Sequence, residues 1–140
     1  MKYCIITISV AAVILIAVAC GKSGDSMTSR NVIKSVAVAN LNATLANDSG
    51  VLNQGDQELM LSFTDASGKP VDVGAIALIF HMPQMGSMAE MNEAVTLTTT
   101  STPGVYRGRV NIEVPGEWQA KLAYEGPVGK GTTTFSVTAQ

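Results

Sequence analysis

The feature that most constrains the fold is the regular alternation of turn-forming residues with short strand-like runs, from about residue 35 to the C-terminus. Clusters rich in Gly, Pro, Asn and Asp recur along this region: Asn47–Gly50, Asn53–Asp56, Asp65–Pro70, Thr102–Gly104, Pro115–Gly116 and Gly126–Gly131. Turn clusters at this spacing are typical of an all-β sandwich or barrel. No stretch beyond residue 50 has the pattern of a long amphipathic helix.

The runs between the turns place apolar side chains at every second position, as a strand with one buried face requires. Two runs show this pattern clearly: Ile76, Leu78, Phe80 and Met82, and then Trp118, Ala120, Leu122 and Tyr124. With an opening strand near Ser35–Leu45, the pattern predicts about seven strands. We therefore predict an all-β fold, a two-sheet β-sandwich, over residues 35–140.

The N-terminal residues have a different composition. The single positive charge of Lys2 precedes the uncharged apolar run Ile5–Ala19, which is shorter than the ~20 residues that span a bilayer and fits a signal peptide. The run ends in "AVAC". Ala17–Ala19 fits an ordinary secretory cleavage site, whereas Cys20 directly after it resembles a bacterial lipobox. An uncleaved signal anchor is the third alternative, and all three place the remaining chain outside the cytoplasm.

We predict a lipoprotein signal peptide at residues 1–19, then a lipidated Cys20 and a flexible tether over residues 20–34, rich in Gly and Ser at its start. The protein would be exported and anchored in the membrane through Cys20, facing the periplasm or the cell surface. Cys4 would leave with the signal peptide, and the chain has only 2 Cys. The mature domain would then have no free thiol and no disulfide, so a soft-metal site must use Met and His.

The most unusual motif is "HMPQMGSMAEM" at His81–Met91, which holds the only His and four of the 7 Met. Pro83 and Gly86 argue against a helix, because Pro removes an amide donor and Gly disfavours helical backbone. The motif follows one predicted strand and precedes another. We expect a loop or irregular hairpin at one end of the sandwich.

Thioether and imidazole groups are the ligands that copper(I) prefers, whereas hard ions prefer carboxylates. A loop could fold these side chains around one ion. The predicted metal ligands are His81, Met85 and Met88, with Met82 and Met91 as second choices.

Two interpretations without metal fit the same residues. Met82 continues the apolar stripe of its strand and would then belong to the core, with His81 on the opposite face. Exposed methionines can also form an adaptable surface that contacts another protein. The spacing of the motif does not decide between copper(I) binding, packing and protein contact.

Other functions find no support in the sequence. The chain has 9 Lys and Arg against 11 Asp and Glu, without a basic cluster, which argues against a nucleic-acid partner. No nucleophile motif, Gly-rich phosphate loop or convergent acid–base pair is recognisable. We predict that the protein is not an enzyme.

Three short motifs together resemble the YtkA-like domain family, which is related in style to FixH proteins. The matching residues are Met82, Pro83 and Met85, then Pro103, Gly104 and Tyr106, then Pro115, Gly116 and Trp118. The resemblance covers roughly residues 50–138. It implies an exported or membrane-anchored immunoglobulin-like β-sandwich, often found in copper-handling settings.

Two functions follow as expectations. The first is an exported, lipid-anchored module that binds copper(I) through the Met-rich loop and exchanges it with a copper donor or acceptor protein. The alternative is a metal-free envelope domain whose Met-rich loop contacts a protein partner.

Overall fold

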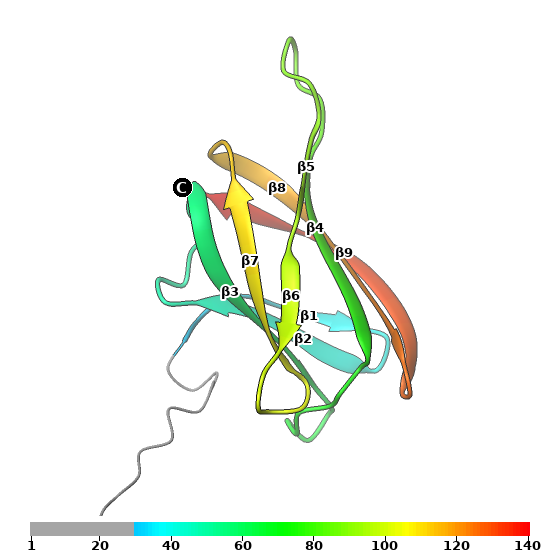
Figure 1. The fold of residues 1–140 in the computed structure, drawn as a ribbon. Coiled ribbons are helices and arrows are strands. Elements are labelled where there is room, and N and C mark those ends of the chain that lie inside the picture. Colours follow the sequence, from blue (N-terminus) through cyan, green and yellow to red (C-terminus); the bar gives the residue numbers. More distant parts are fainter. Residues whose placement is uncertain (1–29) are drawn as a thin grey trace, which may run out of the picture.

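The computed structural model describes residues 30–140, which form nine strands in two antiparallel sheets (Figure 1). The larger sheet has the strand order β1-β2-β3-β7-β6, and the smaller sheet has the order β5-β4-β8-β9. The predicted all-β sandwich is confirmed. The strands are β1 (Asn31–Val38), β2 (Leu41–Asn47), β3 (Gly55–Thr64), β4 (Ala75–Met82), β5 (Met91–Ala94), β6 (Thr96–Thr99), β7 (Val105–Ile112), β8 (Gly116–Gly126) and β9 (Gly129–Ala139).

The structure has more strands than the predicted seven because two runs that look continuous in the sequence are divided. The opening run turns back after β1, where Ala39 adopts a left-handed conformation with φ of 52°. The run after the methionine motif changes sheets, since β5 pairs with β4 while β6 pairs with β7. Neither break contains Gly or Pro, the strongest markers of a turn, and the first is marked by Asn40 alone.

The N-terminal predictions fall mostly outside the part of the chain that the structure describes. This applies to the signal peptide at residues 1–19, to Cys20 and to most of the tether. β1 begins at Asn31, so strand structure starts inside the segment assigned to the tether. Within residues 30–140, no helix combines the length and hydropathy needed to cross a membrane.

The core lies between the two sheets and is built from the alternating apolar positions. Leu61 and Phe63 of β3 are buried against Leu78 and Phe80 of β4 and their neighbours in one continuous cluster. The edge of the Phe63 ring meets the rings of Tyr106 and Tyr124, with centroids 6.1 and 5.6 Å apart. Such edge-to-face pairs add to the stabilisation that burial provides.

The first Pro-Gly turn ties the start of β7 to the connection between β3 and β4. Gly104 has a φ of +82°, and a Cβ there would lie 2.6 Å from the Val71 carbonyl oxygen. The buried Tyr106 hydroxyl donates to Asp72, at 3.0 Å, and accepts from the Val73 amide, at 3.3 Å. The turn motif is therefore explained by packing.

The second Pro-Gly turn lies beside the methionine motif. Gly116 has a φ of +133°, and a Cβ there would lie 3.2 Å from Cε of Met82. Trp118 is completely buried, and its indole N–H donates to the Val114 carbonyl at 3.1 Å. Tyr106 and Trp118 thus both fill the core.

Candidate functional site: a methionine hairpin

The methionine motif forms a hairpin between β4 and β5. At its base, His81 pairs with Asn92 and Met82 pairs with Met91. At its tip, Met85 and Met88 form an antiparallel bridge in the same register, with backbone N···O distances of 3.2 and 2.9 Å. Figure 1 shows this hairpin as a narrow projection beyond the ends of the other strands. We call residues 81–92 the methionine hairpin.

The tip is a two-residue turn formed by Gly86 and Ser87. Gly86 has a φ of +56°, whereas Ser87 is not among the residues with positive φ. Positive φ at the first central position only, occupied by Gly, is the mark of a type II′ hairpin turn. The expected loop is thus a hairpin with regular pairing at its base and at its tip.

The four methionines, which recur every third residue, form two cross-strand pairs in the hairpin: Met82 with Met91 and Met85 with Met88. The two pairs are separated by residues 83–84 and 89–90, which make no strand pairs, and three residues of extended chain span at most ~10 Å. The two pairs also differ in exposure, because Met82 is 2% exposed inside the sandwich whereas Met85 and Met88 are 55% and 44% exposed on the projecting tip. The structure therefore does not bring the four methionines to one point.

The pair at the base belongs to the sandwich. Met82 lies in the core cluster with its methyl group beside Gly116, and Met91 is half-buried against the same cluster. This is the environment that the packing interpretation predicts for Met82. An ion could reach the Met82 sulfur only by displacing core contacts.

His81 has a partner of its own across the hairpin. Its Nδ1 lies 2.8 Å from Oδ1 of Asn92. Because an amide oxygen only accepts, Nδ1 donates in this hydrogen bond. His81 is four residues from Met85, or ~13 Å along the strand. The two predicted ligands are therefore not adjacent.

Met85 and Met88 form the part of the motif that could hold a soft ion. Side chains that face each other across a strand pair have Cβ atoms ~5 Å apart, and the Met side chain is flexible. Both sulfurs can therefore approach one ion between them. Residues 30–140 contain no group of three or more His, Cys, Asp or Glu side chains placed to hold a metal ion.

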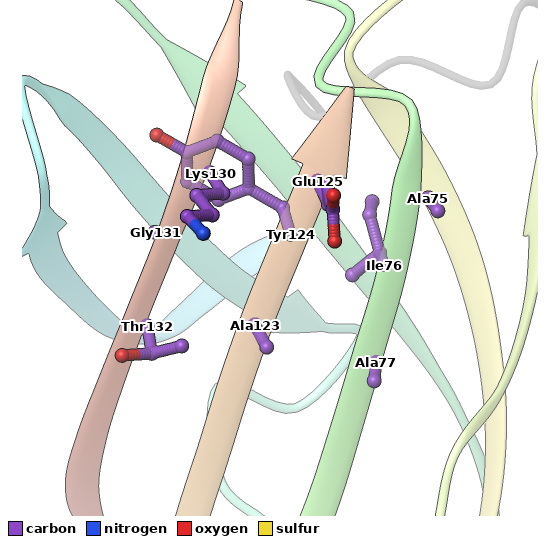
Figure 2. A pocket seen from close by; sticks show the side chains of 9 residues that line it. All are labelled: Ala75, Ile76, Ala77, Ala123, Tyr124, Glu125, Lys130, Gly131 and Thr132. Atoms are coloured by element: carbon purple, nitrogen blue, oxygen red, sulfur yellow. The ribbon is translucent and has the colours of Figure 1, made fainter.

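A second surface feature was not predicted from the sequence pattern. An open hollow lies at the beginning of β4, where small side chains of β4 and β8 leave space beside Glu125 and Lys130 (Figure 2). The alternating small residues Ala75 and Ala77 are the sequence feature that marks it. It lies on the order of 30 Å along β4 from the hairpin tip. One acidic and one basic side chain beside alanine residues do not indicate a particular reaction.

The fold and the hairpin define a class of protein: an antiparallel β-sandwich domain that carries a thioether pair on a projecting hairpin. The model of the YtkA-like family matches residues 35–123, and the chain belongs to this family. The matched region contains all three motifs that carried the resemblance. No curated protein and no solved structure shows significant similarity to the chain. The YtkA-like family is not a known enzyme family, and membership suggests an exported domain of the cell envelope.

Proposed function

We propose that this protein is an exported, lipid-anchored module that binds copper(I) through Met85 and Met88 and exchanges it with another protein. The observation that carries this proposal is the pairing of two exposed thioethers across the hairpin tip. Thioethers are soft and neutral, so they suit copper(I) better than hard ions. Copper is the cargo here and not a structural component.

The position of the pair suits ligand exchange. A projecting tip leaves room for the ligands of a donor or acceptor protein to approach the ion. Two thioethers also leave coordination positions open, so a partner can bind the ion before the hairpin releases it.

The geometry changes the ranking of the predicted ligands. In the proposal, Met85 and Met88 bind the ion, whereas Met82 and Met91 fix the base of the hairpin to the core. His81 orients the base through Asn92 and lies too far along the strand to share an ion with the tip.

The lipid anchor at Cys20 is the second part of the proposal. It is supported by the apolar run and by the "AVAC" sequence that ends it. Membership in the YtkA-like family agrees with export. An anchored module would keep the hairpin close to membrane proteins that supply or receive copper.

The test is an anaerobic copper(I) titration against a chromophoric copper(I) chelator. We expect the wild-type protein to compete for copper(I), and the Met85→Leu/Met88→Leu variant to lose this competition while remaining folded. Met82→Leu is the matched control, because it removes a thioether from the core at nearly constant volume and should still compete. Equal competition by the double variant and the wild type would contradict the proposal.

A metal-free contact function is the second candidate. Met85 and Met88 are among the few large apolar side chains exposed in residues 30–140, and both lie on the projecting tip. Exposed apolar residues that cluster in this way mark interaction sites. In this case Leu replacements would preserve partner binding, whereas Met88→Asp would abolish it. If the Leu and Asp variants bound a partner equally well, hydrophobic contact at the tip would be excluded.

A further inference from the structure

The thioether pair at the hairpin tip is an incomplete site. Copper(I) accepts up to four soft ligands, and the tip supplies two. Among the residues that the structure describes, the next thioethers along the chain are Met82 and Met91, at the base of the hairpin and up to ~10 Å of chain away. Met82 is also held in the core. Copper(I) takes between two and four ligands, so a third and a fourth would come from another molecule.

The tip itself is open to a second molecule. It extends beyond the other strands (Figure 1), and both methionines are about half exposed. Residues 83–89 carry no charge, and the first acid on the returning strand is Glu90. Two identical tips can therefore approach each other without bringing like charges into contact at the pair.

We propose that a second copy of this chain completes the site, so that one copper(I) ion joins two hairpin tips through both Met85/Met88 pairs. A two-fold axis through the ion would place the same residues on each side, as in most homodimers. This inference rests on the proposed function. The inference specifies that the additional ligands come from a second copy of the same chain.

The dimer would depend on the metal. A stable protein interface buries at least ~1,000 Å², which a hairpin tip of a few residues does not provide. The copper–sulfur bonds would therefore supply the association energy. Without copper the chains would stay apart, which leaves each tip free to accept an ion from a donor.

The experiment uses the full chain purified in detergent and loaded anaerobically with copper(I) as its acetonitrile complex. X-ray absorption at the copper edge counts the sulfur neighbours, and competition with the chelator gives the stoichiometry. We expect four sulfurs, one ion per two chains, and an apparent affinity that rises with chain concentration. Native mass spectrometry should show a dimer only with copper.

Three variants decide how the sites are completed. Met82→Leu should keep both the sulfur count and the dimer, whereas Met85→Leu/Met88→Leu should lose both. Met27→Leu tests a thioether outside the described residues and should also change nothing. One ion per chain, with an affinity independent of chain concentration, would overturn the dimer while keeping copper binding. Absence of any competition for copper would instead overturn the proposed function itself.

Discussion

Met82 and Met85 are three residues apart, and their surroundings differ completely. Met82 is packed beside Gly116 in the core, and Met85 is 55% exposed at the tip. The cause is their position: Met82 ends β4 inside the sandwich, whereas Met85 belongs to the isolated bridge on the projecting tip. The chemistry available to a methionine in this chain is therefore set by its position in the hairpin register.

The first prediction concerns this difference. Met82→Ala should lower the free energy of unfolding by about 2–5 kcal/mol, because it leaves a cavity in the core. Met88→Ala should change it by less than about 0.5 kcal/mol, because an exposed side chain is removed. Urea denaturation of both variants measures the difference. Equal effects would mean that the two methionines share one environment.

The second prediction concerns Tyr106. Burial raises the pKa of Tyr106 above its ordinary value of 10.0, and the hydrogen bond to Asp72 acts in the same direction. The unfolded chain therefore loses the phenolic proton more readily than the folded chain. The stability that Tyr106 contributes is complete below pH 10 and is lost as the pH rises through its higher folded-state pKa.

Denaturation measured at about pH 9 and about pH 11 checks this effect. We expect the wild type to lose more stability between these two values than Tyr106→Phe does, because Phe cannot ionise. Lys residues titrate in the same range in both proteins, so the difference between the two isolates Tyr106. A parallel loss in both proteins would show that Tyr106 does not contribute.

At the scale of the element, the hairpin depends on its turn. Gly86 begins the type II′ turn with a φ of +56°, in a region that L-residues with a Cβ avoid. The turn sets the register that places Met85 opposite Met88. The thioether pair is thus a property of the turn as much as of the methionines.

The third prediction follows from this turn. Gly86→Ala should cost the tip about 1–2 kcal/mol, because Ala resists the left-handed conformation. The Met85 and Met88 amides should then exchange with solvent faster, by roughly 5–30-fold. Hydrogen exchange measures this change. Gly86→Asn is the control, because Asn tolerates this conformation and should change the rates less.

The sequence was sufficient to predict that the methionine motif is not a helix, because Pro83 and Gly86 exclude it. It did not predict the two pairs, because the register depends on which two residues form the turn. Gly86–Ser87 is a weaker turn marker than Asn-Gly or Asp-Gly. The hypothesis that four methionines and His81 surround one ion therefore assumed a loop without strand alternation.

At the scale of the whole molecule, alternating apolar positions and turn clusters predicted the sandwich, and the structure confirms it. The same pattern missed the change of sheet at Val95. Tertiary contacts make this break. The Val95 amide donates to the Leu78 carbonyl, and the Val95 side chain packs on Gly108, where a Cβ would lie only 2.6 Å from Val95 Cγ1. Because Gly108 lies on β7, the sequence around Val95 gives no indication that the chain changes sheets there.

The fourth prediction concerns the placement of the whole chain. Cys20→Ser should move the exported protein from the membrane fraction to the soluble fraction, because the lipid attachment site is removed. Cys4→Ser lies in the predicted signal peptide and should leave the mature protein in the membrane fraction. Fractionation of cells that express each variant measures this. Retention of Cys20→Ser in the membrane would favour the uncleaved signal anchor.

The change of sheet at Val95 also determines how the hairpin is attached to the sandwich. The chain that returns from the tip forms β5 in one sheet and then β6 in the other. The base of the hairpin is therefore hydrogen-bonded to both sheets. A partner that pulls on the tip would load the hydrogen-bonded ladders of both sheets at once. The base of the hairpin is thus held in both layers, whereas residues 83–84 and 89–90, between its base and its tip, make no strand pairs.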